Sequence, residues 1–215
     1  MFSLDKPVRV LPYLSAFIFF TVCAITFLMS YFQGRWSLYV PTVSETAIGF
    51  PNSLFFAVML GIDAIFICLM FILYRSSLIL NQSVSDGVLK YGNVLTYVCP
   101  LQLIILSSCT IKDSNSVHFG NAVPFFIVVS IYFLVSFIQM KNTYSKFIYI
   151  FRYVSLIVLA VSFLSMGLVF LVLPDPDAMT PHSYSEFVFI STLIIYLMTW
   201  LNEIKTIHVQ FVVEY

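Results

Sequence analysis

The sequence predicts an all-α membrane protein, a bundle of six transmembrane helices with both termini in the cytosol. Of its 215 residues, 60% are hydrophobic and only 9% are charged, whereas soluble domains carry about 25% charged residues. Six apolar runs reach the ~20 residues that a helix needs to cross a bilayer. The runs show no two-residue alternation, so barrel strands are not expected. We therefore expect a single transmembrane domain spanning residues 1–215.

The first expected helix covers residues 11–32 and follows Lys6 and Arg9. This apolar run is too long for a signal peptide and precedes no small-residue cleavage site, so we expect it to be retained. The next four runs are 54–74, 91–111, 118–140 and 147–173, and the sixth is 184–202. Short connections make neighbouring helices antiparallel. The longest run is expected to tilt, or to let Arg152 extend towards the headgroups.

The distribution of basic residues predicts the orientation. Of the 10 Lys and Arg residues, only Arg35 and Lys112 fall in the loops of one side. The side with more basic residues is expected to be cytosolic. The lumenal or extracellular side then carries most of the acidic and imidazole groups outside the helices: Glu45, Asp113, His118, Asp175, Asp177, His182 and Glu186.

The longest polar interruption, residues 39–51, lies between the first two runs. Pro41 and Pro51 bracket Ser44, Glu45 and two threonines. Because proline breaks a helix interior, neither flanking helix continues through this loop. We expect this lumenal loop to carry the function.

Two polar residues are expected deep in the membrane. Asp63 lies midway along the second run, where an ionisable group costs at least ~2.5–3.5 kcal/mol, so a functional role is one interpretation. Gln102 lies at a similar depth on the third run and is a natural hydrogen-bond partner. The other interpretation is that the pair only fixes how the two helices pack.

The start of the sixth run carries His182 and Glu186, four residues apart and therefore on one helix face. The segment from Ser183 to Glu186 also has the Ser-x-x-Glu pattern of a capping box, in which Glu186 bonds the amide of its own helix. His118 opens the fourth run. It is either a polar anchor at the interface, or a general base or pH sensor near Glu45 and Glu186.

Established catalytic and metal motifs are absent from the sequence. Ser44 with His118 and Glu45 is the candidate nucleophile set, but no G-x-S-x-G elbow accompanies it. His118 and His182 have no H-E-x-x-H spacing for zinc, so neither a metal nor a cofactor is expected. The cysteines show no C-x-x-C pair and fit buried packing. The net charge of zero gives no indication of a nucleic-acid partner.

Several stretches carry a family resemblance. Residues 41–46, Pro-Thr-Val-Ser-Glu-Thr, are similar to a Pro-x-[Ile/Val]-Ser-[Asp/Glu]-Thr segment, and Phe55-Phe56 follow Pro51. His118 opens a helix after a short polar loop, and the last helix starts at Ser185-Glu186-Phe187 and ends in residues 196–203. In these features the chain resembles the superfamily of damage-regulated autophagy modulators (DRAM), post-GPI-attachment remodelling factors and CWH-type N-terminal domains. Ala47-Ile48-Gly49 is closer to the GPI-remodelling branch, whereas the sixth helix is closer to DRAM.

The resemblance implies an endomembrane protein that handles lipids, foremost in GPI-anchor lipid remodelling in the Golgi or ER. The alternative is a non-enzymatic, DRAM-like modulator of autophagy in the lysosomal or plasma membrane, acting through protein partners. In the first case Pro41, Ser44, Glu45, His118 and Glu186 are expected to bind a lipid headgroup, possible partners being membrane lipids and the GPI glycolipid. Acyl transfer would use His118 as base, oriented by Glu45 or Glu186, but the lack of a catalytic motif argues against an enzyme acting alone. A transporter or channel is less favoured, because only Asp63 and Gln102 are polar at mid-depth.

Overall fold

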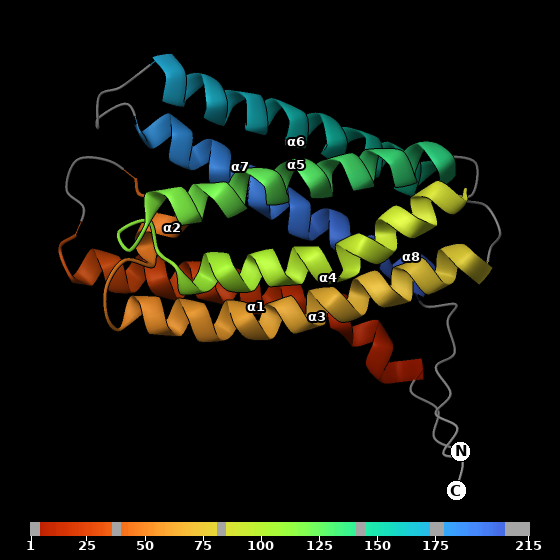
Figure 1. Ribbon diagram of the computed structural model, residues 1–215, viewed down its shortest axis with the longest axis horizontal. Coiled ribbons are helices and arrows are strands. Elements are labelled where there is room, and N and C mark those ends of the chain that lie inside the picture. Colours follow the sequence, from red (N-terminus) through yellow and green to blue (C-terminus); the bar gives the residue numbers. More distant parts are fainter. Residues whose placement is uncertain (1–4, 36–39, 81–84, 141–144, 173–178, 205–215) are drawn as a thin grey trace, which may run out of the picture.

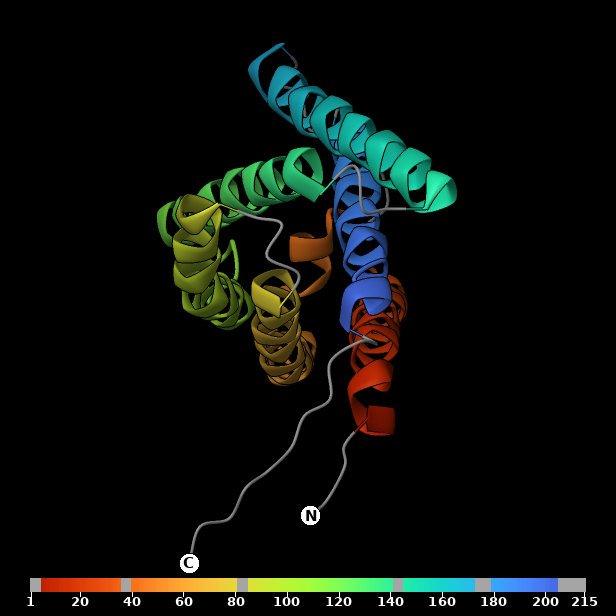
Figure 2. The same cartoon turned by 90° about the vertical axis from the view of Figure 1, so that its right-hand side faces the viewer.

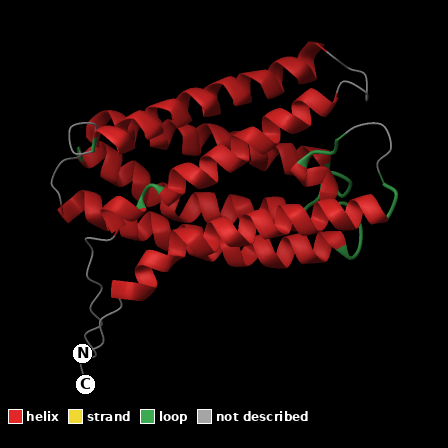
Figure 3. Cartoon of the chain, turned by 180° about the vertical axis from the view of Figure 1, so that it is seen from behind, coloured by secondary structure: helices red, strands yellow, loops and turns green. Residues whose placement is uncertain are grey.

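The computed structural model describes residues 5–35, 40–80, 85–140, 145–172 and 179–204. In these ranges the regular structure is entirely helical (Figure 3). Six of the helices are long and apolar enough to cross a membrane. This confirms the predicted all-α, six-span class.

The helices follow one another along the chain with short links. Their bounds are α1 Asp5–Phe32, α2 Val43–Thr46, α3 Asn52–Leu80, α4 Asp86–Ser108, α5 Asn115–Met140, α6 Lys146–Val172, α7 Met179–Met198 and α8 Leu201–Ile204. Most of the spanning helices extend beyond the apolar runs, since a hydrophobic run marks the hydrocarbon core and not the end of the helix. α1 begins at Asp5, α3 continues to Leu80, and α7 begins five residues before the predicted start at 184.

Consecutive spanning helices run in opposite directions (Figure 1). One end of the bundle holds α2, the link between α4 and α5, and the first turns of α7; we call it the α2 end. The start of α1 and the short helix α8 lie at the opposite end (Figure 1). Viewed along the bundle, α2 lies inside the arrangement of helices, between α5 on one side and α7 and α1 on the other (Figure 2).

The opposite half of the bundle is packed around aromatic side chains. Trp200, between α7 and α8, is fully buried. Its ring stacks on Tyr74 of α3 with centroids 4.1 Å apart and meets the rings of Phe71 and Phe133 edge to face. Phe133 of α5 also stacks on Tyr196 of α7 at 4.2 Å. Such offset and edge contacts are the preferred aromatic geometries, so this cluster joins α3, α5 and α7.

The side chain of Arg152 on α6 turns into the bundle and does not extend outward, as one of the two expectations for this helix had it. Its side chain is fully buried, and Nη2 donates to Oε2 of Glu203 on α8 at 2.9 Å. Nε donates to the hydroxyl of Thr199 at 2.8 Å, and Nη2 also reaches the Thr199 carbonyl oxygen at 3.0 Å. A carboxylate inside the bundle therefore balances the guanidinium charge, and no path to water is needed.

Candidate functional site

α2 is a single helical turn that begins with a complete capping box. Thr42, directly after the buried Pro41, has extended backbone angles (φ −66°, ψ 163°). The Thr42 hydroxyl accepts the Glu45 amide at 3.1 Å, and Oε2 of Glu45 accepts the Thr42 amide at 2.8 Å. This reciprocal pair satisfies two amides that a helix start leaves open. After α2, Gly49 takes the left-handed conformation (φ 76°) at the turn into α3.

Hydrogen bonds tie the C-terminal side of α2 to α1 and α3. The hydroxyl groups of Thr46 and Thr26, on α1, lie 3.0 Å apart, and both residues are buried. Asn52 at the start of α3 donates from Nδ2 to the Thr46 carbonyl oxygen at 2.9 Å. Its Oδ1 accepts from Nε2 of Gln33 at 3.2 Å. Asn52 is fully buried, so these bonds satisfy its amide where water does not reach.

Glu186 ties α2 to α7. Its Oε2 accepts the backbone amide of Val43 at 3.1 Å. The predicted capping box at Ser183 is wrong, because α7 already begins at Met179 and Glu186 lies inside the helix. The carboxyl group therefore accepts a hydrogen bond from an amide in the first turn of another helix. The start of α7 also meets the chain before α2, where the Val40 amide donates to the Thr180 hydroxyl at 3.3 Å.

Ser44 and His118 form the link between α2 and α5. Nε2 of His118 lies 2.9 Å from Oγ of Ser44, and Nδ1 lies 2.9 Å from the carbonyl oxygen of Cys109. A carbonyl oxygen only accepts, so Nδ1 carries the proton in the neutral ring and Nε2 accepts from the Ser44 hydroxyl. His118 is 5% exposed. Glu186 accepts the amide of Val43, the residue before Ser44, so a carboxyl group joins Ser44 and His118 at the same helical turn.

The structure therefore brings together Ser44, Glu45, His118 and Glu186 around α2. We call these four residues the α2 cluster. In it, Nδ1 of His118 is held by the Cys109 carbonyl oxygen, whereas Oε2 of Glu45 closes the capping box and Oε2 of Glu186 binds the Val43 amide. Sequence reasoning did not find the orienting role of Cys109, since a backbone carbonyl leaves no signal in residue type.

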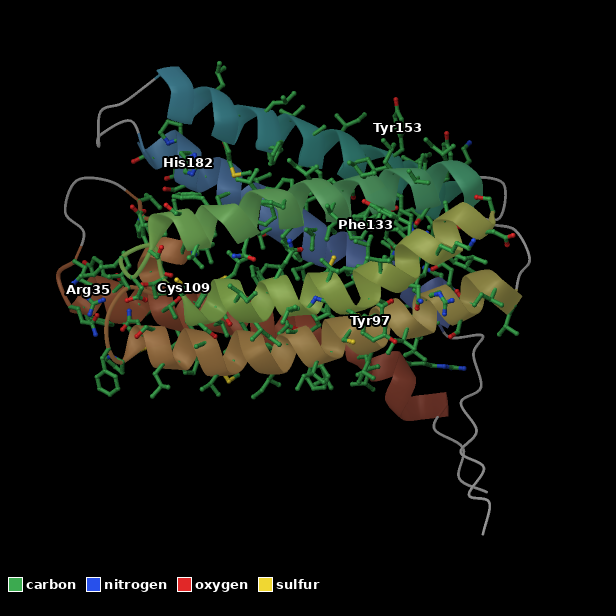
Figure 4. All side chains as sticks on the ribbon, in the orientation of Figure 1. Arg35, Tyr97, Cys109, Phe133, Tyr153 and His182 are labelled. Carbon is green, nitrogen blue, oxygen red and sulfur yellow. The ribbon has the colours of Figure 1, made fainter. Side chains whose placement is uncertain are left out.

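His182 contacts a different neighbour. Its Nδ1 lies 3.3 Å from the carbonyl oxygen of Met166 on α6. His182, Cys109 and Arg35 all lie at the α2 end (Figure 4), but His182 faces α6 and Glu186 faces α2. Asp175 and Asp177 lie outside the described residues. Within the described ranges, no group of three or more His, Cys, Asp or Glu side chains has the geometry of a metal site.

Asp63 and Gln102 do not form the hydrogen-bonded pair that was predicted. Asp63 is fully buried in α3. Among the described residues, neither of its carboxylate oxygens nor Oε1 of Gln102 has a hydrogen-bond partner. The buried hydroxyl of Ser15 on α1 is also unsatisfied. A similar depth along two helices does not fix which way each helix face turns.

An apolar groove runs along the seam between α1 and α7. It consists of two adjoining shallow depressions of about 530 and 520 Å³, open to the outside of the bundle, which share Phe20 and Ala24 of α1. One extends to Met198 at the end of α7, and the other extends to Val40 and Tyr184 at the α2 end. From Tyr184 to Met198 the helix rises about 21 Å at ~1.5 Å per residue, which exceeds the ~15 Å hydrocarbon depth of one leaflet. The groove is therefore long enough to hold an acyl chain.

A comparison with protein families agrees with the resemblance in the sequence. The family described as Frag1/DRAM/Sfk1/Cwh43P N-terminal domain matches residues 7–207 of the chain. The matched region contains all six spanning segments and the α2 cluster. Neither a curated protein nor a solved structure matches the chain.

Proposed function

The chain belongs to the Frag1/DRAM/Sfk1/Cwh43P N-terminal domain family of membrane proteins, and we propose that it handles lipids in GPI-anchor remodelling within the secretory pathway. One observation carries this proposal: the polar α2 cluster and one end of an apolar surface groove lie at the same end of the bundle (Figure 1). Val40, which lines the groove, comes three residues before Val43, the first residue of α2.

The α2 cluster has the chemistry to hold a lipid headgroup. Ser44 and His118 offer a hydroxyl and an imidazole, and Glu45 and Glu186 offer carboxyl groups that accept from sugar or glycerol hydroxyls. Ser44 and Glu45 are partly exposed, whereas His118 and Glu186 lie behind them. A headgroup therefore meets the α2 face first.

The groove supplies the apolar half of the site. Phe20, Phe27 and Phe187 line it together with small side chains such as Ala24. An acyl chain laid here buries apolar surface at roughly 25 cal/mol per Å² if it leaves water, but a chain arriving from the bilayer gains only packing contacts. The polar cluster must therefore provide the selectivity for one lipid class.

The distribution of basic residues supports a lumenal α2 end, which is where the glycan of a GPI anchor lies. Of the 10 Lys and Arg residues of the sequence, only Arg35 and Lys112 fall in the links at the α2 end. An endomembrane location, in the Golgi or the ER, belongs to the same proposal.

The test uses cells that lack this protein and carry a GPI-anchored reporter. Wild type is expected to restore surface display and the lipid composition of the reporter, and the double variant Glu45→Ala, His118→Ala is expected to fail. His182→Ala is the matched control, since it removes an imidazole at the same end of the bundle, one whose Nδ1 lies 3.3 Å from the Met166 carbonyl oxygen of α6. Unchanged reporters in the deficient cells would reject the remodelling function, and lysosomal and autophagic readouts then test the DRAM-like alternative.

A further inference from the structure

We propose that Ser44 is an acyl-accepting nucleophile and that His118 is its general base, with a membrane glycerophospholipid as the acyl donor. The inference deepens the lipid-handling function proposed above and rests on it. It assigns a reaction, a covalent intermediate and a donor class to the α2 cluster.

The first support is the geometry of the pair. Oγ of Ser44 lies 2.9 Å from Nε2 of His118, within the hydrogen-bond reach required of a nucleophile and its base. The Cys109 carbonyl oxygen at 2.9 Å from Nδ1 fixes the ring so that the Nε2 lone pair faces the hydroxyl. A base held in place by a third group is the arrangement shared by serine nucleophiles on unrelated folds.

The second support is that α2 does not need this bond to stay in place. Its C-terminal side is held by Asn52 and Thr26, and its first turn by Glu186 and the capping box. If the Ser44–His118 hydrogen bond only held α2 against α5, it would be one of several bonds that hold α2 in place. Replacing the Ser44 hydroxyl is therefore expected to leave the fold intact, which separates a chemical role from a structural one.

The third support concerns exposure and the donor. Ser44 is partly exposed, whereas His118 is 5% exposed, so the residue that carries the hydroxyl lies nearer the surface and its base is shielded from bulk water. The α1–α7 groove opens along the bundle surface and reaches Val40, four residues before Ser44. A lipid with one chain in this groove would hold its ester bonds at the level of the bundle end. The acyl group therefore comes from a phospholipid in the same membrane.

The reaction balances in two halves. Oγ of Ser44 attacks the ester carbonyl carbon while its proton passes to Nε2 of His118. The bond from that carbon to the glycerol oxygen breaks, and the glycerol oxygen takes the proton, so a lysophospholipid leaves and a fatty acyl ester remains on Ser44. A lysolipid hydroxyl then attacks the same carbon and gives its proton to Nε2; Oγ of Ser44 leaves and takes that proton back.

The experiment uses the purified full-length protein in phosphatidylcholine nanodiscs and a long-chain alkyl fluorophosphonate bearing an alkyne. Intact-mass and peptide analysis is expected to find one adduct on Ser44 in the wild type and none in Ser44→Ala. His118→Gln is expected to label about 100-fold more slowly, the lower end of what a general base contributes. His182→Gln is the matched control and is expected to label at the wild-type rate. Thermal unfolding of each variant checks that it is folded.

A second measurement uses the proposed donor class itself. Phosphatidylcholine with a labelled fatty acyl chain is expected to leave label on wild-type protein that hydroxylamine releases, and none on Ser44→Ala. Folded wild type that takes neither adduct nor acyl label at Ser44 overturns the proposal, as does His118→Gln that labels as fast as wild type.

The outcome is separable from that of the proposed function. If Ser44→Ala restores the GPI-anchored reporters fully, the nucleophile is rejected and the remodelling function stands. If Ser44 is acylated but the reporters do not depend on the protein, the acyl chemistry stands and its acceptor is a lipid other than the GPI anchor.

Discussion

Removing the carboxylate of Glu203 should destabilise the protein strongly. Arg152 is fully buried and donates to Oε2 of Glu203 at 2.9 Å. Glu203→Ala leaves the guanidinium with its bonds to Thr199, which are neutral acceptors and do not balance the charge. Breaking a buried pair from one side costs ~3–5 kcal/mol, so we expect a loss of about 4 kcal/mol in the free energy of unfolding.

The double variant Arg152→Met, Glu203→Leu distinguishes this reasoning from a simple loss of contacts. It removes both charges and keeps apolar volume, so we expect it to lie within ~1 kcal/mol of wild type or above it, as apolar replacements of buried pairs often do. The coupling between the two sites should then be several kcal/mol, far beyond the ~0.5 kcal/mol scatter of independent sites.

Equilibrium unfolding in mixed detergent micelles measures these differences. The protein has two tryptophans, so a Trp36→Phe background leaves Trp200, which stacks on Tyr74 at 4.1 Å, as the fluorescent reporter of the packed state. A Glu203→Ala cost below ~1 kcal/mol, the range of exposed pairs, would refute the claim that this pair is desolvated. Additive single-variant costs in the double variant would refute it as well.

Three further predictions follow from local geometry. Gly92→Ala should cost ~1–3 kcal/mol through overpacking, because its new Cβ would lie 2.9 Å from the hydroxyl oxygen of Tyr132; Gly61→Ala, which meets nothing within 4 Å, is the thermal-unfolding control and should be neutral or slightly stabilising. Asn52→Ala should speed amide hydrogen exchange throughout α2, because it removes the buried donor to the α2 carbonyl; unchanged exchange would mean that this bond does not hold the turn. Asp113 accepts hydrogen bonds from a hydroxyl and an amide of the α4–α5 link, and these bonds lower the pKa of its carboxyl group. Their contribution to stability is therefore present above the unfolded pKa of about 3.9 and is lost as the pH falls through the lower folded value. An acid titration of the link by NMR should show this pH dependence in the wild type and not in Asp113→Asn.

The six spans were predictable because the thickness of the hydrocarbon core sets the length that an apolar run needs to cross it. Helix ends were not, since α1 begins at Asp5 and α7 at Met179, both of which lie outside the apolar runs. The pattern Ser/Thr-x-x-Glu occurs at both Thr42 and Ser183, and the rule holds only at Thr42. A capping box needs a helix that begins there, and α7 has already begun by Ser183.

The composition of the candidate site was predictable in large part, but its contacts were not. Ser44, Glu45, His118 and Glu186 were selected because polar groups at one end of a membrane bundle are expected to gather. Ser44 and His118 are 74 residues apart, so no local spacing rule reports that they touch. The roles of Cys109 and of Asn52 depend on backbone carbonyls, and these become visible only when the helices are packed.

The ties of α2 to α1, α3, α5 and α7 have a consequence for how the protein is made. α2 leaves the ribosome early, yet the partner of its Val43 amide, Glu186, lies 143 residues later in the chain. Membrane insertion of the first four spans can therefore supply His118 but not the last helix. The cluster is completed only after the sixth span has entered the bilayer and docked, so a chain stalled or truncated before α7 carries the loop without the finished site.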